Sequence, residues 1–74
     1  MTDKQRFLKK LGKHIAKVRK SKGYSQDRVF LETEGFSRST VSRIEKGQVN
    51  PEVWTLARIA TTLGISLSKL LDID

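Results

Sequence analysis

The chain has 74 residues, which is enough for one small domain near the lower size limit for folding on its own core. It has no cysteine, which excludes disulfides and thiolate metal sites, so its stability must come from a well-packed helical core or from dimerisation. No apolar run approaches the roughly 20 residues of a membrane span, and the N-terminus lacks the apolar core of a signal peptide. We therefore expect a cytoplasmic protein with residues 1–74 in a single domain.

The formal net charge of +7 is unevenly distributed along the chain. Within residues 1–24 the only acidic side chain is Asp3. The basic side chains of the same segment are Lys4, Arg6, Lys9, Lys10, Lys13, Lys17, Arg19, Lys20 and Lys22. So strong a positive field favours a nucleic acid or an anionic membrane surface as the partner, although it does not specify the fold.

The first predicted helix covers residues 4–22, and Gly12 is expected to weaken its middle. Its large apolar side chains recur at three- and four-residue intervals, and lysines fill much of the opposite face. These apolar residues are Phe7, Leu8, Leu11, Ile15 and Val18. A basic amphipathic helix could also lie on a membrane. Because the apolar stripe is only moderately wide and has the rest of the chain to pack against, we assign it to the core and expect no membrane partner.

The second predicted helix runs from Gln26 to about Thr33 and is capped by the Ser25 hydroxyl. Residues 29–31 are Val, Phe and Leu in succession, so at least one of these side chains should be exposed. A turn at Gly35 leads to Ser37, which can cap a third helix that ends at Gly47. Two short helices joined by a glycine-containing turn are typical of a helix-turn-helix.

The third predicted helix has two different faces at about 100° per residue. The inner side carries Ser37, Thr40, Val41 and Ile44. The outer side carries Arg38, Ser39, Ser42, Arg43 and Lys46. On this outer side short hydroxyl residues separate two arginines, and no carboxylate interrupts them. Such a surface can lie close against something flat and anionic, with the arginine side chains reaching into it. The alternative is an ordinary solvated face.

The last two predicted helices complete the fold. Asn50 can cap a fourth helix that begins at Pro51 and ends at Gly64. Its inward residues are expected to be Val53, Leu56, Ile59, Ala60 and Leu63. Ser66 then caps a short fifth helix over residues 67–71. We therefore expect an all-α, compact five-helix domain. Trp54 lies early in the fourth helix and is interpreted as half-buried structure, with contact to a partner chain as the alternative.

Several segments together resemble the helix-turn-helix family of lambda-type repressors and Cro, also called the XRE-like family. They are VRKSKGYSQ at 18–26, SRSTVSRIEKG at 37–47, NP at 50–51 and LARIATTLGIS at 56–66. The resemblance covers roughly residues 10–71, and it is specific because the spacings hold across all four segments. The chain departs from the commonest family pattern by one additional residue between Gln26 and Gly35. Phe30 or Leu31 also stands where the family usually has a small alanine.

The resemblance implies that the third helix enters the major groove of DNA. The side chains it places at base edges are Gln26, Arg38, Ser39, Ser42 and Arg43. We assign phosphate contact or positioning to Ser25, Thr40, Lys46, Gln48 and Asn50. Gln26 is expected to brace the N-terminal end of the third helix as well. Arg19 and Glu45 match a family ion pair that links the first helix to the end of the third.

The C-terminal segment is the expected surface of a homodimer. Its large aliphatic residues are Ile65, Leu67, Leu70, Leu71 and Ile73. The helix can turn only some of them toward its own small core, so the others would form an apolar patch that a symmetric partner covers. The alternative is that they merely seal the helical bundle.

These observations predict a sequence-specific, stand-alone DNA-binding transcriptional regulator that occupies a double-stranded operator. The alternative is an antitoxin-type or other protein-interaction module with the same fold. We expect no enzymatic activity, because no nucleophile–base pair or metal site is visible in the sequence. His14 is the only histidine, and no cysteine or second histidine could complete a metal site with it. We also expect no cofactor and no small-molecule ligand.

Overall fold

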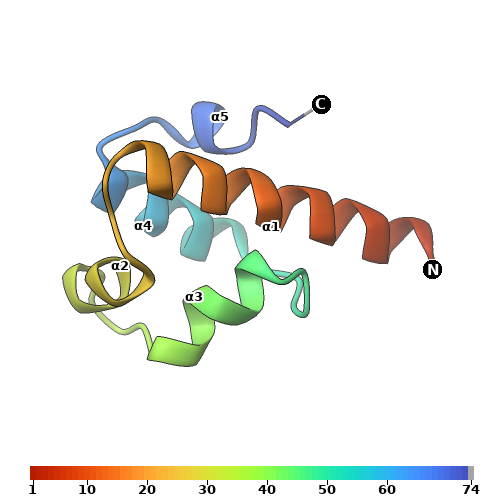
Figure 1. The fold of residues 1–74 in the computed structure, drawn as a ribbon, viewed down its shortest axis with the longest axis horizontal. Coiled ribbons are helices and arrows are strands. Elements are labelled where there is room, and N and C mark those ends of the chain that lie inside the picture. The colour runs from red at the N-terminus through yellow and green to blue at the C-terminus, as the bar shows by residue number, and fades with distance from the viewer. Residues whose placement is uncertain (74) are drawn as a thin grey trace.

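Five helices follow one another along residues 1–73, the part of the chain that the computed structural model describes. They are α1 (Asp3–Ser21), α2 (Gln26–Glu32), α3 (Arg38–Glu45), α4 (Val53–Leu63) and α5 (Leu67–Leu70). Helix α1 runs along the molecule and packs against both α3 and α5, while α2 packs against α3 and α4 (Figure 1). The predicted five-helix, all-α fold is confirmed.

Hydroxyl caps and glycines define most of the helix ends. The Ser25 hydroxyl accepts a hydrogen bond from the Arg28 amide, and the Ser66 hydroxyl accepts one from the Lys69 amide, as predicted. Gly47 follows α3 in the left-handed conformation, with φ +72°. Ser37 occupies the N-cap position of α3, but its hydroxyl lies 2.7 Å from the Thr40 hydroxyl and caps no backbone amide.

The predicted start of the fourth helix is wrong. Helix α4 begins at Val53 with Glu52 as its N-cap, whereas the sequence favoured Pro51 after an Asn50 cap. Glu52 has an extended backbone, with ψ 151°, so the chain cannot enter a helix before it. Val49 in the same loop packs against the core, which attaches this non-helical segment to the rest of the domain.

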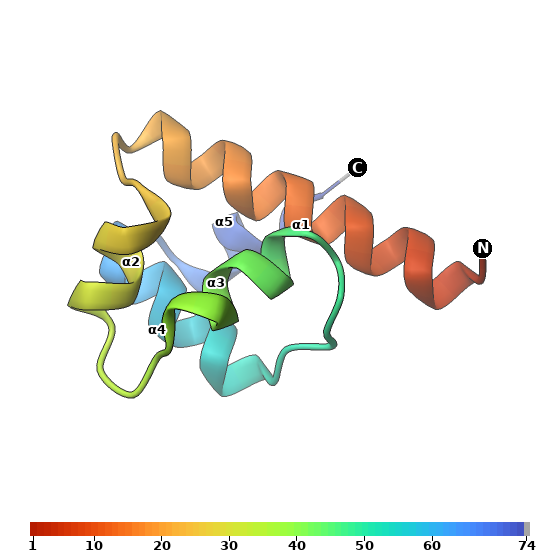
Figure 2. The ribbon, with the colours of Figure 1, turned by 60° about the horizontal axis from the view of Figure 1, so that its bottom comes forward.

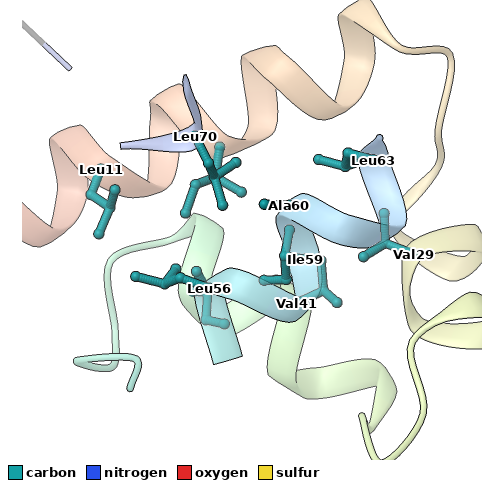
Figure 3. Close-up of a cluster of buried hydrophobic side chains, with 10 residues drawn as sticks. Leu11, Val29, Val41, Leu56, Ile59, Ala60, Leu63 and Leu70 are labelled. Carbon is teal, nitrogen blue, oxygen red and sulfur yellow. The ribbon is translucent and has the colours of Figure 1, made fainter. Parts of the chain in front are cut away.

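All five helices contribute to one apolar core, shown in Figure 3. Its buried members are Leu11, Ile15, Val29, Val41, Ile44, Leu56, Ile59, Ala60, Leu63 and Leu70. Burying a large aliphatic side chain of this kind contributes about 1.5–3 kcal/mol, so this cluster is the main source of stability. Of the consecutive apolar residues 29–31, Val29 is buried, Phe30 packs at the edge of the core and Leu31 is exposed, as expected for such a run.

Three aromatic or aliphatic side chains that the sequence placed wholly or partly in the interior are exposed. Phe7 is 55% exposed because the first turns of α1 extend beyond the helices that cover the rest of its apolar stripe. Val53 and Trp54, in the first turn of α4, are 67% and 70% exposed. The interpretation of Trp54 as half-buried structure is therefore wrong.

Helices α1 and α3 approach each other closely enough to exclude side chains. A Cβ atom on Gly12 would lie 2.5 Å from the carbonyl oxygens of both Ile44 and Glu45. A Cβ atom on Gly47 would lie 2.7 Å from the backbone N and Cα of Lys9. The sequence suggested only that Gly12 weakens its helix, but the structure gives this glycine a role in packing two backbones together.

Residues 33–37 connect α2 to α3. Thr33 ends α2 with an extended backbone and is 4% exposed, and its hydroxyl lies 2.7 Å from the Thr62 hydroxyl on α4. Gly35 then turns the chain with φ +82°, and Phe36 packs against the core. This connection is thus fixed at both of its ends.

The contact at Gly12 predicts the effect of replacing it. Gly12→Ala should lower the free energy of unfolding by about 1–3 kcal/mol, because the added methyl group meets two backbone carbonyls that cannot move independently. Helix propensity alone predicts a gain of up to about 1 kcal/mol, so the two accounts differ in sign. Urea denaturation followed by circular dichroism measures the change, with Lys13→Ala on the exposed face of α1 as the control. A Gly12→Ala protein more stable than the wild type would contradict the close packing.

Candidate nucleic-acid interface

The outer face of α3, the start of α2 and the residues after α3 enclose an open groove of about 730 Å³. We call it the recognition groove. It is lined by Gln26, Asp27, Ser37, Arg38, Ser39, Ser42, Arg43, Lys46 and Gln48. The structure thus brings together all five residues that the sequence assigned to base edges, and two of those assigned to phosphates. The opposite face of α3 is buried through Val41 and Ile44, each 2% exposed.

Three other residues assigned to phosphates lie outside the recognition groove. Thr40 and Asn50 line a neighbouring hollow of about 250 Å³, together with the acidic Glu52, and this hollow shares Ser39 and Arg43 with the recognition groove. Ser25 is exposed at the start of α2, with its hydroxyl oxygen already accepting the Arg28 amide. In Figure 2 α3 lies beside α1, and the loop after α3 curves toward α4. The predicted phosphate residues are therefore spread over α3 and the segments on either side of it rather than gathered in one cluster.

A buried carboxylate fixes the end of α3. Arg19 Nε and Nη2 donate to the two Glu45 carboxylate oxygens at 2.7 and 3.0 Å, and these side chains are only 10% and 6% exposed. The remaining Arg19 Nη1 donates to the Tyr24 carbonyl oxygen at 2.8 Å. The predicted ion pair between α1 and α3 is confirmed, and its bidentate geometry is the strongest form of such a pair.

Gln26 joins the same carboxylate from α2. Its Nε2 donates to Glu45 Oε1 at 2.8 Å. The expectation that Gln26 braces the N-terminal end of the third helix is therefore wrong, because Glu45 is the last residue of α3. The start of α2 lies beside the end of α3, so one carboxylate connects three helices.

The recognition groove contains a carboxylate that the sequence did not predict there. Arg38 Nε lies 3.3 Å from Asp27 Oδ1, and the two side chains are 75% and 58% exposed. The outer face of α3 itself carries no acidic residue, but α2 supplies one beside it. The position of Asp27 directly after Gln26 is the only sequence signal that could have indicated this, since it depends on where α2 crosses α3.

The C-terminal apolar residues divide into core and surface. Leu70 is fully buried, so its assignment to a dimer surface is wrong, and it fills the space between α1 and α4 instead. Ile65, Leu67 and Ile73 are half-buried against the core. Leu71 is 38% exposed and is the most accessible large aliphatic residue of this segment.

Two further polar contacts lie away from the recognition groove. Arg28 Nε donates to Glu32 Oε2 at 2.6 Å, and this hydrogen bond raises the pKa of Arg28 above its ordinary value. His14 is half-buried, with Nε2 located 3.3 Å from the Lys69 carbonyl oxygen. Among residues 1–73 there is no cluster of three histidine, aspartate or glutamate side chains suited to a metal ion. Over the same range no helix combines the length and apolarity needed to cross a membrane.

The burial of Glu45 predicts a large effect on stability. Glu45→Ala should lower the free energy of unfolding by about 3–5 kcal/mol, because it leaves the Arg19 guanidinium buried without its partner. Glu32→Ala is the matched control, because its ion pair with Arg28 is about half exposed and should contribute only about 0–1 kcal/mol. Thermal and urea unfolding followed by circular dichroism compares the two variants. Equal losses of stability in both would show that burial of the Glu45 pair has no energetic consequence.

Comparison with known proteins assigns the family. A helix-turn-helix family model matches residues 15–70. The chain is 39% identical over 62 residues to the HTH-type transcriptional regulator y4dJ of Sinorhizobium fredii, covering 84% of this chain and 79% of that protein. It is 38% identical over 65 residues to the HTH-type transcriptional regulator SlrR of Bacillus subtilis, covering 86% of this chain but only 42% of that protein.

Two solved structures share the fold. The restriction-modification controller protein C.AhdI from Aeromonas hydrophila superimposes with a TM-score of 0.80 at 33% identity, over 85% of this chain and 94% of that chain. A helix-turn-helix family transcriptional regulator from Vibrio cholerae superimposes with a TM-score of 0.82 at 31% identity, over 92% of this chain and 38% of that chain. The chain therefore belongs to the helix-turn-helix family, in its lambda repressor and Cro-like (XRE-like) group of DNA-binding transcriptional regulators.

Proposed function

We propose that residues 1–74 act as a single helix-turn-helix domain that binds a specific double-stranded operator and thereby regulates transcription. The observation that carries this proposal is the recognition groove, which gathers Arg38 and Arg43 on the exposed face of α3 with Lys46 directly after the helix. The buried ion pair of Glu45 holds that face in a fixed orientation. A helix presented in this way fits the major groove of B-DNA, which is wide enough to admit it.

In this proposal the two arginines read bases, and the small residues between them allow α3 to approach closely. An arginine pairs bidentately with guanine O6 and N7, while serine can bond to several base edges. Ser39 and Ser42 lie on the recognition groove with both arginines, and Gln26 reaches it from α2. Positioning on the phosphates falls to Thr40 within α3 and to residues outside this helix, namely Ser25, Lys46, Gln48 and Asn50.

A homodimer is part of the proposal. One domain of this size contacts too few base pairs to distinguish an operator from the excess of non-specific DNA, and self-association is the simplest way to double the contacts. The surface we assign to it consists of Leu71 with the exposed parts of Ile65, Leu67 and Ile73. We further propose that the protein acts in the cytoplasm without catalysis, a cofactor or a small-molecule ligand.

Exposed apolar side chains on α2 and α4 support the antitoxin-type or protein-interaction role as a second candidate. Leu31, Val53 and Trp54 are each at least 67% exposed, and none of them lies on the recognition groove. A hollow of about 300 Å³ beside Trp54 is lined by parts of α2 and α4. Loss of a protein partner on Trp54→Ala, with DNA binding unchanged, would distinguish this role from operator binding.

Base reading and phosphate positioning predict different mutant behaviour. Arg38→Ala and Arg43→Ala should each weaken binding to the cognate site by about 1–3 kcal/mol and relax base preference at one position of each half-site. Lys46→Ala should weaken binding to all sequences about equally, because a phosphate contact carries no base information. Selection from a random-site library, followed by anisotropy titrations, measures both quantities. Unchanged preferences in both arginine variants would exclude α3 as the reading element.

The proposed dimer surface predicts a change of oligomeric state. Leu71→Lys should shift the protein from dimer to monomer at micromolar concentration, because it places a charge in the apolar contact. Its melting temperature as a monomer should change little, since this side chain is already 38% exposed. Analytical ultracentrifugation with and without a palindromic operator, whose half-sites lie about 34 Å apart, gives the measurement. A wild type that is monomeric alone and binds one chain at a time would exclude the dimer.

A further inference from the structure

The first turns of α1 extend past the other helices, as Figures 1 and 2 both show. The family match begins at residue 15, so residues 1–14 lie outside the part of the chain that it covers. These turns carry Lys4 and Lys9, and both side chains are exposed. Neither lysine was assigned a role in binding by the sequence.

The extension of α1 forms one wall of a second groove, of about 930 Å³, whose other wall is the loop after α3. We call it the flanking groove. It is lined by Met1, Thr2, Lys4, Gln5, Leu8, Lys9, Lys46, Gly47, Gln48, Val49 and Asn50. Three of these residues are lysines and none is acidic. Asp3, the only carboxylate nearby on α1, does not line the groove and pairs with Arg6 at 3.5 Å.

Lys4 lies on the face of α1 whose following residues are buried in the core. Residues 4, 8, 11 and 15 follow the spacing of one helical face. Leu8, Leu11 and Ile15 on this face are buried. Lys4 continues the same face one turn beyond the end of the core. It is therefore directed toward the flanking groove, whereas lysines on the opposite side of α1 project into open solvent.

The two walls of the flanking groove are held rigidly. Gly47 in the loop lies against the backbone of Lys9, and Gly12 lies against the carbonyl oxygens at the end of α3. Because the two walls already touch through their backbones, neither can shift toward the other, and the buried ion pair of Arg19 with Glu45 holds the same two helices together. The part of α1 that carries Lys4 and Lys9 thus keeps a fixed position relative to α3, whose outer face lines the recognition groove.

The flanking groove is continuous with the recognition groove, because Lys46 and Gln48 line both. We propose that the flanking groove is a second nucleic-acid site, which binds the sugar–phosphate strand beyond the base pairs read by α3 through Lys4 and Lys9. This inference rests on the proposed operator binding. A phosphate strand fits because it is anionic, it extends on either side of any base contact, and it needs positive charge without base-specific groups.

A comparison of matched charge-removal variants tests the proposal. In Lys4→Ala/Lys9→Ala the two lysines that α1 contributes to the flanking groove are removed, and in Lys10→Ala/Lys17→Ala two lysines of the same helix that line neither groove are removed. The wild-type dimer, with roughly 6–10 phosphate contacts, should show a log–log salt slope of about −5 to −9. The first variant should reduce the size of this slope by about 2 per bound protomer, and the second should leave it nearly unchanged.

Trimming the duplex locates the contact. When the DNA is shortened to the base pairs that contact α3, the salt slope of the wild type should fall by the same amount as it does in the Lys4→Ala/Lys9→Ala variant on full-length DNA. The salt slope of that variant should not change further on the shorter DNA. Lys4→Arg/Lys9→Arg should retain the wild-type slope, because arginine also binds phosphate. Circular dichroism melts verify that every variant is folded.

The outcomes separate this inference from the proposed function. If the wild type binds no duplex from a random library, the proposal of operator binding is wrong, and the inference of a flanking DNA site is excluded as well. If the wild type binds but the two double-alanine variants have equal salt slopes, the flanking groove does not bind DNA, while operator binding still stands. This outcome covers the case in which Lys4 and Lys9 bind a protein partner instead. A slope reduced only in the Lys4→Ala/Lys9→Ala protein, together with its insensitivity to trimming, supports the site.

Discussion

The geometry of the recognition groove depends on the buried carboxylate of Glu45. It accepts hydrogen bonds from Arg19 on α1 and from Gln26 on α2, and thus connects three helices at the last residue of α3. Removing two charges from water costs several kcal/mol, which bidentate geometry and complete hydrogen bonding can offset. Both conditions hold here, since the remaining guanidinium nitrogen also donates to the Tyr24 carbonyl. The main effect of the pair is therefore to fix the position of α3, and its contribution to net stability is smaller.

Backbone packing complements this polar contact. Gly12 and Gly47 allow α1 to touch the end of α3 without intervening side chains. Arg19 lies further along the same helix, so α1 is attached to α3 both by close van der Waals contact and by an ion pair. Because α1 is one continuous helix of 19 residues, its extended first turns share this attachment. The charge of the N-terminal segment is consequently part of a rigid surface.

Much of the fold could be predicted because the relevant forces act over a few residues. Apolar periodicity and hydroxyl caps located most of the helices, and the spacing within α3 separated Val41 and Ile44 from the outer face that lines the recognition groove. The Arg19–Glu45 pair followed from the family resemblance. Periodicity gives the direction of a side chain but not the extent of the neighbouring helix, so Phe7 and Val53 were wrongly placed in the core. Contacts between helices, such as Asp27 with Arg38, depend on a crossing angle that no local pattern contains.

The Asp27 carboxylate makes the two arginines of the recognition groove unequal. An exposed ion pair contributes about 0–1 kcal/mol, whereas a bidentate arginine–guanine contact is worth about 1–3 kcal/mol of discrimination. Arg38 therefore gains by leaving Asp27 when a guanine is within reach, and gains little when another base is there. In the second case the carboxylate remains close to the negatively charged DNA, which adds repulsion to the missing hydrogen bonds. Arg43 has no ion-pair partner among residues 1–73, so its attraction to DNA is not offset in this way. Within the proposed function, Asp27 lowers overall affinity and raises the penalty for an incorrect base at the position that Arg38 reads.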